Sequence, residues 1–218
     1  MTSSDPSLVI LGSGGHAAVV AEAATRSGWR VVGVASREMP AAERPFERAD
    51  WLGDPDDVDG RARIGALLAQ GAKVHAAVGD ATLRRRWTSF FEEHGIDALA
   101  AVVDPSAVVS PSARLAPGVF IATGAIVHAR AVVGTGAIIN TRAVVEHDCV
   151  VGEFAHVSPG AILCGGVRVG RSAQVGAGAV VVPNRSIGDG ATVGAGAVVI
   201  RDIVSGVTAV GVPAVVRT

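Results

Sequence analysis

The sequence is poor in aromatic residues and in cysteine. It has no Tyr, three Trp and five Phe among 218 residues, although 49% of its residues are hydrophobic. So little aromatic volume argues against a conventional large core and suits a repetitive one. Two cysteines, Cys149 and Cys164, cannot build a disulfide framework, and the first residues, MTSSDPS, resemble no secretory signal. We therefore expect a cytoplasmic protein with free thiols.

Charge and long apolar runs are scarce as well. The net charge is −1 at pH 7, which gives no electrostatic case for binding nucleic acid or an anionic membrane. The single basic cluster, Arg84-Arg85-Arg86, is predicted to lie on a solvated helix face. No stretch of 18 uninterrupted apolar residues occurs, so we expect no membrane span.

What the sequence does contain is a repeat with a period of six. From Val103 to Val199, every sixth residue is Val, Leu or Ile, seventeen in succession. Four places after each comes a second column, from Ala107 to Ile203, in which twelve of seventeen residues are Ala. This period fits neither a helix nor simple alternation, but it fits a short strand followed by a tight corner. Coils of this kind stack at about 4.8 Å and bury their faces against their neighbours, which predicts a parallel β-solenoid.

The residues before the repeat alternate between strand and helix patterns. Asp80 is expected to cap the start of the last helix, and Gly28 and Gly95 to follow the ends of the first and last helices. Strands that alternate with helices predict a small parallel α/β domain. The expected strands are 8–11, 30–35 and 73–79, and the expected helices are 17–27, 64–71 and 81–94.

A glycine-rich turn, GSGGH, follows the first expected strand. Gly12 and Gly14 begin a dinucleotide-binding pattern, but Ala17 stands at its third glycine, and no clear acidic residue ends the second strand. The turn still presents backbone N–H groups at the start of a helix and near the carboxyl end of a strand. That arrangement favours an anion such as phosphate.

Together, the turn, the hexads of residues 102–203 and three further motifs resemble one enzyme family over essentially the whole chain. The motifs are IN at 139–140, VEHDCVVGEFAHVSPGA at 145–161 and VGVPAVVR at 210–217. They resemble sugar acetyltransferases of the PglD/NeuD type, in the hexapeptide-repeat superfamily. The resemblance implies a Rossmann-like α/β domain at 1–98 that binds a nucleotide sugar, a left-handed parallel β-helix at 99–207 and a C-terminal tail at 208–218.

The resemblance also implies an activity. It is the transfer of acetyl from acetyl-CoA to the 4-amino group of a nucleotide-linked 4-amino-4,6-dideoxy sugar, as in lipopolysaccharide and glycan precursor biosynthesis. It implies no metal, and a homotrimer with active sites between subunits. His147 is the expected general base, because an imidazole titrates near neutral pH, and Asp148 is its expected carboxylate partner.

Further roles are expected, some from the resemblance and some from the position of a residue on the repeat. Asn140 is expected to contact the acceptor sugar, and the backbone N–H of Gly165, one coil of eighteen residues after His147, is a candidate oxyanion donor. Arg201 or Arg217 would meet coenzyme A phosphates. The expected nucleotide-sugar residues are Gly12, Ser13, Gly14, Gly15, His16, Gly79 and Asp80, and the expected acetyl-CoA residues are His156, Gly165, Gly176, Ala195 and Arg201.

A contact between the side chains of His147 and Asp148 has a geometric requirement. His147 and Asp148 come two and three residues after the inward-facing Val145, and neighbouring residues of an extended strand point to opposite sides. Direct contact between them therefore requires the chain to bend there.

Three alternatives stay open. One is a sugar O-acetyltransferase of the sialic-acid type, which the sequence separates poorly from an N-acetyltransferase. Another is a γ-class carbonic-anhydrase-like zinc enzyme, but the spacings of 19 and 9 between His128, His147 and His156 do not match its ligand set. The last is a non-catalytic scaffold, against which the intact His-Asp pair argues.

Overall fold

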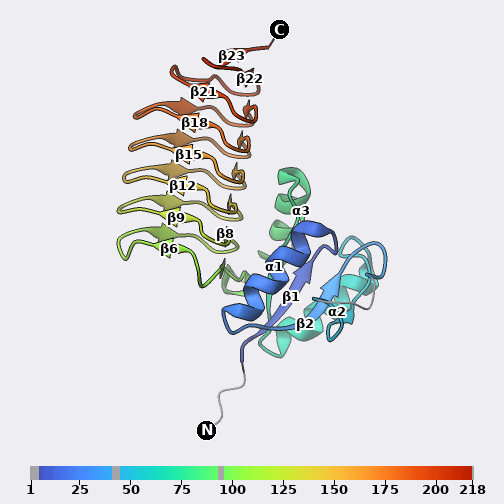
Figure 1. The fold of residues 1–218 in the computed structure, drawn as a ribbon. Coiled ribbons are helices and arrows are strands. Elements are labelled where there is room, and N and C mark those ends of the chain that lie inside the picture. The colour runs from blue at the N-terminus through green and yellow to red at the C-terminus, as the bar shows by residue number, and fades with distance from the viewer. Residues whose placement is uncertain (1–4, 41–44, 93–95, 218) are drawn as a thin grey trace. The chain divides into compact units, whose positions relative to one another are not determined.

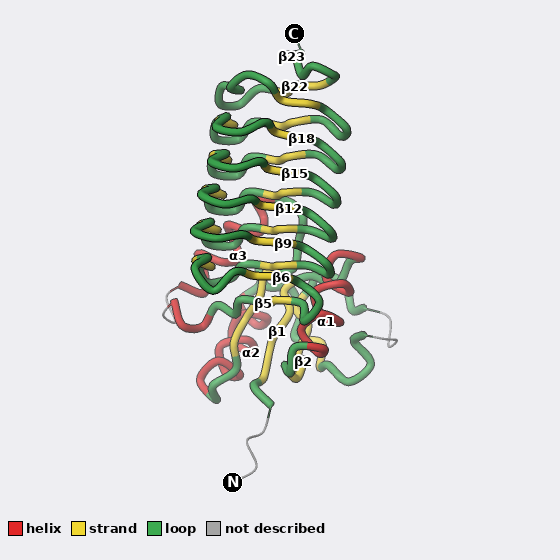
Figure 2. The backbone as a smooth tube through the Cα atoms, turned by 60° about the vertical axis from the view of Figure 1, so that its left-hand side comes forward, coloured by secondary structure: helices red, strands yellow, loops and turns green. Residues whose placement is uncertain are grey.

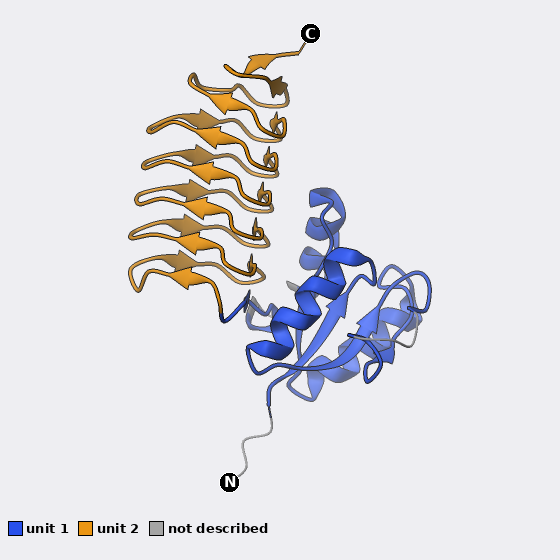
Figure 3. Cartoon of the chain, in the orientation of Figure 1, with its two compact units in different colours: residues 1–105 blue, residues 106–218 orange. Residues whose placement is uncertain are grey.

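The computed structural model describes residues 5–40, 45–92 and 96–217, and the chain divides into two compact units, 1–105 and 106–218 (Figure 3). The first unit holds a parallel four-stranded sheet in the order β3-β2-β1-β4, with helices packed on it (Figure 1). Its elements are β1 Ser7–Leu11, α1 Gly15–Arg26, β2 Arg30–Ala35, β3 Asp50–Trp51, α2 Val58–Ala69, β4 Lys73–Ala76, α3 Ala81–Glu92, the 3-10 helix η1 Ile96–Ala98 and β5 Val102–Val103.

The expected helix signals act as predicted where the structure describes them. The Leu83 N–H donates to Oδ1 of Asp80 at 2.7 Å, which caps α3. Gly28 follows α1 with φ +89°, the left-handed conformation that a glycine adopts freely. Gly95, the expected end of α3, lies outside the described residues. The signals thus fix where α1 ends and where α3 begins.

The largest differences from the sequence expectation are at β3 and α2; in addition, β4 ends at Ala76, three residues before the expected end, and η1 was not predicted. Strand β3 was not predicted, because two residues are too few to show a period. Helix α2 begins at Val58, six residues before the expected start, and Gly60 obscures its pattern. Gly60 is needed there, because a Cβ would come within 2.0 Å of the Asp54 carbonyl oxygen.

The second unit is the left-handed parallel β-helix, a column of stacked coils with short strands and tight corners (Figure 2). From β6 to β21, strands pair with the strand three places along the chain, eighteen residues away, as Val132 does with Val150. The strands are β6 Val108–Val109, β7 Arg114–Leu115, β8 Phe120–Ile121, β9 Ile126–Val127, β10 Val132–Val133, β11 Ile138–Ile139, β12 Val144–Val145, β13 Val150–Val151, β14 His156–Val157, β15 Ile162–Leu163, β16 Arg168–Val169, β17 Gln174–Val175, β18 Val180–Val181, β19 Ser186–Ile187, β20 Thr192–Val193, β21 Val198–Val199, β22 Thr208–Val210 and β23 Val215–Val216.

Three sheets make the sides of this prism. One side carries β6, β9, β12, β15, β18 and β21, the next carries β7, β10, β13, β16 and β19, and the third runs from β8 to β22, which pairs with the last strand, β23. The second residue of each pair points inward, and from Ile121 to Val199 these aliphatics are at most 3% exposed. The small residues of the second column fill the corners, where Ala125 to Ala179 are buried with Cys149 among them. The period of six therefore encodes the core directly.

No helix in the described part of the chain is long and apolar enough to cross a membrane.

Candidate active site

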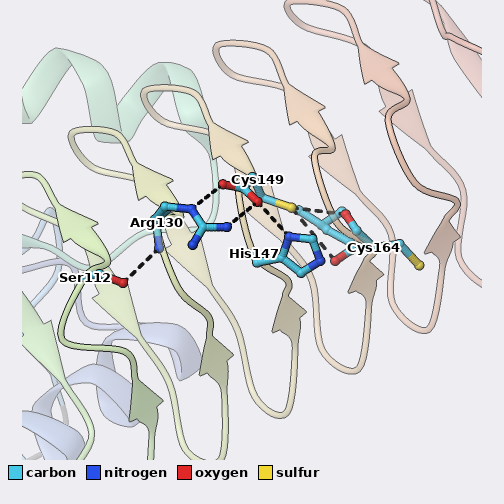
Figure 4. Close-up of polar contacts among 7 residues, drawn as sticks. Ser112, Arg130, His147, Cys149 and Cys164 are labelled. Atoms are coloured by element: carbon cyan, nitrogen blue, oxygen red, sulfur yellow. Dashed lines mark hydrogen bonds and ion pairs between the residues drawn. The ribbon is translucent and has the colours of Figure 1, made fainter.

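The predicted general base, His147, and its carboxylate partner, Asp148, lie at a corner of the β-helix, between β12 and β13. Nδ1 of His147 lies 2.7 Å from Oδ2 of Asp148, so the two adjacent side chains are in direct contact (Figure 4). The required bend is present, because Asp148 has φ +62°, the left-handed conformation that Asp tolerates better than most residues. The Asp148 N–H donates to the Ala129 carbonyl of the coil before, at 3.1 Å, which holds the bend in place.

The carboxylate of Asp148 has a second partner that the sequence interpretation missed. Nε of Arg130 donates to Oδ1 at 2.7 Å, and Nη2 donates to Oδ2 at 2.8 Å. The Arg130 guanidinium and, after it, the hydrogen bond with His147 hold the pKa of Asp148 below its usual range. Arg130 precedes Asp148 by eighteen residues, so stepping back one coil from Asp148 would have found it.

The imidazole of His147 lies against the coil that follows. A Cβ on Gly165 would come within 2.7 Å of both Cε1 and Nε2 of His147, so only glycine fits at that position with the ring where it stands. The structure therefore brings together three of the predicted residues, His147, Asp148 and Gly165. Because His147 is 58% exposed, its Nε2 remains within reach of a substrate.

A second pair of predicted residues meets at another corner of the β-helix. Nδ2 of Asn140 lies 3.0 Å from Nε2 of His156. Oδ1 of Asn140 accepts the Thr141 N–H at 2.8 Å, so the amide group is the donor toward His156. Nε2 of His156 must then be the acceptor, which makes the imidazole neutral with its proton on Nδ1.

The two pairs lie at opposite edges of one side of the prism. Asn140 comes just before β12, and His147 comes just after it; His156 begins β14 on the β8–β22 side. The side between them, roughly 15 Å wide from the rise of an extended chain, separates the two corners. Within one chain, His147 and His156 therefore do not share a site.

The glycine-rich turn of the first unit leaves a helix N-terminus without a side-chain cap. Gly14 is the N-cap of α1, no side chain caps it, and the first turn carries no acidic residue. Gly12 has φ +113°, and a Cβ there would come within 3.0 Å of the Ala77 carbonyl oxygen. The turn therefore lies beside the end of β4, where Gly79 and Asp80 follow, and its N–H groups suit an anion.

A buried cationic group lies close to this turn. Arg84 is 1% exposed, and its Nη1 donates to the carbonyl oxygens of Val78 and Gly79 at 2.8 and 2.9 Å. Burial lowers the pKa of Arg84 to about 10, so it stays charged at neutral pH. The interpretation of the Arg84-Arg85-Arg86 run as a solvated helix face is wrong for Arg84. It holds for Arg85 and Arg86, which are exposed, because α3 turns its first arginine toward the sheet.

Two histidines share this environment. Burial first, and then the charge of Arg84, lower the pKa of His16 to about 4. Burial lowers the pKa of His75 to about 4 as well, and its Nδ1 lies 2.9 Å from the Ala100 carbonyl oxygen, to which it donates. Both rings are therefore neutral at physiological pH. His75 carries no signal in the sequence that sets it apart from other strand residues.

The remaining predicted acetyl-CoA residues lie along later coils. Gly176 is buried, donates its N–H to the Val193 carbonyl at 2.8 Å and allows the coil with Ala195 to approach closely. Ala195 and Arg201 are exposed, and Arg217 lies at the exposed C-terminal end. No contact in the described structure links these four to His147, so their roles stay predictions.

Cys149 is a packing residue behind the corner that carries His147 and Asp148. Burial raises the pKa of Cys149 to about 11, and its Sγ donates to the Cys164 carbonyl at 3.1 Å. Its thiol is therefore protonated at neutral pH and fills a corner.

Among the described residues, no group of three His, Cys, Asp or Glu side chains is placed to hold a metal ion. Nε2 of His128 lies 3.8 Å from Oε1 of Glu146.

Comparisons with known proteins agree with this architecture. A family model described as the PglD N-terminal domain matches residues 7–90, and a model described as bacterial transferase hexapeptide (six repeats) matches residues 166–201. A comparison with curated protein sequences finds no match.

Solved structures match over the whole chain. Perosamine N-acetyltransferase from Caulobacter crescentus, as a mutant in complex with CoA and GDP-perosamine, is 39% identical over 97% of each chain, with a TM-score of 0.86. The acetyltransferase domain of PglB from Neisseria gonorrhoeae, in complex with acetyl coenzyme A, is 32% identical over 98% of this chain and 100% of that one, with a TM-score of 0.88. WeeI from Acinetobacter baumannii, at 22% identity and a TM-score of 0.77, shares the fold. This chain therefore belongs to the hexapeptide-repeat sugar acetyltransferases that carry a PglD-type N-terminal domain.

Proposed function

We propose that this protein transfers the acetyl group of acetyl-CoA to the 4-amino group of a nucleotide-linked 4-amino-4,6-dideoxy sugar. The observation that carries the proposal is the exposed imidazole of His147, held by the ionised carboxylate of Asp148 at a corner of the β-helix. Its support is the family, because similar structures hold acetyl coenzyme A, or CoA with GDP-perosamine.

The chemistry follows from the hydrogen bond at Nδ1. Because Nδ1–H of His147 donates to Asp148, Nε2 carries the lone pair and accepts a proton from the attacking amine. The amine nitrogen bonds to the acetyl carbon, and the thioester oxygen takes up the displaced electron pair. The backbone N–H of Gly165 is the proposed donor to that oxyanion. Collapse of the intermediate breaks the C–S bond, and the imidazolium returns its proton to the CoA thiolate.

The first unit is proposed to hold the nucleotide part of the acceptor. The uncapped N-terminus of α1 offers the N–H groups of Gly15 and His16 to a phosphate, and the buried charge of Arg84 adds a positive potential nearby. Ser13, Gly14, Gly79 and Asp80 line the same edge of the sheet in this proposal, although the Asp80 carboxylate also caps α3.

A homotrimer with sites between subunits completes the proposal. The outward residues of the β6–β21 side form an aliphatic ladder with no polar member, and such a face suits burial against a second copy. Since His147 lies at one edge of that side and Asn140 with His156 at the other, a neighbouring copy would bring the two pairs together. The ladder is Val108, Ile126, Val144, Ile162, Val180 and Val198. A cytoplasmic location stays a prediction from the sequence.

The test is thiol release from acetyl-CoA with a panel of UDP-, GDP- and dTDP-linked 4-amino sugars. Sialic acid and non-amino nucleotide sugars serve as controls. Turnover with one amino sugar is the expected result, and it would also identify the base. Activity on a hydroxyl acceptor alone would replace the proposal with O-acetylation.

A further inference from the structure

Arg130 contacts Asp148, the carboxylate partner of the candidate general base His147, and the proposed mechanism assigns Arg130 no role. Its two nitrogens reach both oxygens of Asp148, and Oδ2 also faces Nδ1 of His147 at 2.7 Å (Figure 4). A fork of two parallel N–H donors fixes the plane of a carboxylate as well as its distance. One carboxylate thus joins a permanent cation to the imidazole.

The backbone holds this arrangement in register. Arg130 and Asp148 occupy the left-handed position of the same corner on consecutive coils, with φ of 61° and 62°. The Arg130 N–H donates to Oγ of Ser112, on the coil before, at 3.1 Å. The guanidinium therefore starts from a fixed corner directly beside the carboxylate, and the ladder between coils sets the spacing.

We propose that Arg130 is a positioning residue for the acetyl transfer: its guanidinium orients the Asp148 carboxylate toward Nδ1 of His147, and its charge offsets that of the carboxylate. The orientation keeps the proton of His147 on Nδ1 and the lone pair on Nε2. The charge offset limits how strongly Asp148 stabilises the imidazolium, so removing the guanidinium should strengthen that stabilisation.

Other charges near His147 do not replace this one. On the same coil, Glu146 contacts His128, with Nε2 and Oε1 3.8 Å apart. The coil that follows offers the uncharged Cys164, Gly165 and Gly166 at this corner. Removing the guanidinium would thus leave Asp148 as the charged group in contact with the imidazole.

The experiment compares Arg130→Met, Arg130→Lys and a matched control, Arg171→Met. Arg171 pairs with Asp189 across consecutive coils, with Nε and Oδ2 3.3 Å apart, and like Arg130 its side chain is 65% exposed. Two readouts are taken: kcat/KM against pH, and the titration of the His147 imidazole by ¹⁵N NMR without substrate. The His147 signal is assigned by its loss in His147→Asn.

Arg130→Met is expected to lower kcat/KM about tenfold, a part of what a general base contributes. The rising limb of its pH profile and the NMR titration of His147 should both move to higher pH. Arg130→Lys keeps the charge but loses the two parallel N–H donors. It should return the rising limb and the NMR titration to their wild-type pH, and restore only part of the rate. Arg171→Met should match the wild type.

Three results would overturn the proposal. One is an unchanged rate and titration in Arg130→Met. Another is a loss of rate that follows a lower Tm and that Lys does not relieve, since that marks a structural role. The third is an equal shift in Arg171→Met. The kinetic readout rests on the proposed function, but the NMR titration needs no substrate, so it decides the role of Arg130 even if no acceptor on the panel is acetylated.

Discussion

In residues 106–218 each position of the six-residue repeat has one structural role, so a residue of the wrong type for its position can be recognised in the sequence. Residues 1–105 have no repeat against which a residue can be compared in this way. His147 and Asp148 occupy a corner whose inside is filled by the buried Cys149, so two polar side chains there stand out from the repeat. Arg84, by contrast, looks in the sequence like Arg85 beside it, although it is 1% exposed.

The difference teaches where each unit keeps its polar groups. In the β-helix, chemistry lies on the outside of corners, because the inside is filled by one aliphatic and one small residue per hexad. In the α/β unit, charged and titratable groups enter the interior, where backbone carbonyls or neighbouring charges engage them. Substitutions of the buried polar residues in the first unit should therefore affect folding, and substitutions of His147 and the residues that contact it should affect catalysis.

The largest effect is expected at the base itself. His147→Asn should lower kcat/KM about 10²- to 10⁴-fold, the range that general base catalysis contributes. A residual rate that rises with pH should remain, because an amine needs no base once it is neutral. His128→Asn, an exposed histidine of the preceding coil, is the control and should retain activity. A rate that is abolished at every pH in a folded variant would contradict an amine acceptor.

Arg84→Met should show how much a buried charge contributes to the stability of the first unit. Loss of the guanidinium leaves the Val78 and Gly79 carbonyls without this donor, which should lower the free energy of unfolding by about 3 kcal/mol. Arg85→Met, on the exposed face of the same helix, should change it by less than about 0.5 kcal/mol. Urea denaturation of both variants measures the contrast, and equal effects would refute the buried role of Arg84.

Two glycines sharpen the comparison within the β-helix. Gly165→Ala should displace the His147 ring and lower kcat about tenfold while the Tm is kept, because the three heavy atoms nearest to the added Cβ all belong to that exposed ring. Gly152→Ala would put a Cβ within 2.8 Å of the Arg171 backbone nitrogen, so it should lower stability by about 1–3 kcal/mol. If Gly165→Ala lost stability instead of activity, the placement of the ring would be wrong.

The remaining prediction is a dependence of stability on pH that arises in the first unit. The pKa values of His16 and His75 are about 4 in the folded protein and about 6.5 unfolded. The unfolded state therefore binds more protons between these values, and stability should fall as the pH drops from about 6.5 toward 4. Urea denaturation at pH 7 and pH 5 measures the fall, which should be smaller in His16→Asn. A stability that rose toward pH 5 would contradict the burial of both rings.

The repeat made much of the β-helix predictable. The inward column, the small column and the eighteen-residue coil all follow from the period. The structure confirms the coil length, and it confirms the burial of the inward column from Ile121 to Val199. The contact between His147 and Asp148 depended on a bend, which the left-handed corner supplies. Arg130 escaped notice because a side chain one coil away is a neighbour in space only after the coil length is applied to each polar residue.

The first unit was predictable only in outline. Alternating patterns gave three strands and three helices, and the Asp80 cap followed from residue type. Burial of Arg84 and His75 did not follow, because a helix or strand pattern does not say which polar residue faces the sheet when carbonyl acceptors are available there. The spacing of aliphatic residues does not predict which polar side chain is buried.

The most direct test of the account is complementation between two inactive variants in one assembly. His147→Asn and His156→Ala chains, with different tags, are co-expressed, and mixed assemblies are isolated by both tags. If one copy supplies His147 and its neighbour supplies His156, one interface in each mixed trimer is intact, and about a third of wild-type acetyl transfer should return. If both residues served within one chain, every site would carry a defect, and activity in the mixed assemblies no higher than in either variant alone would contradict a site shared between subunits.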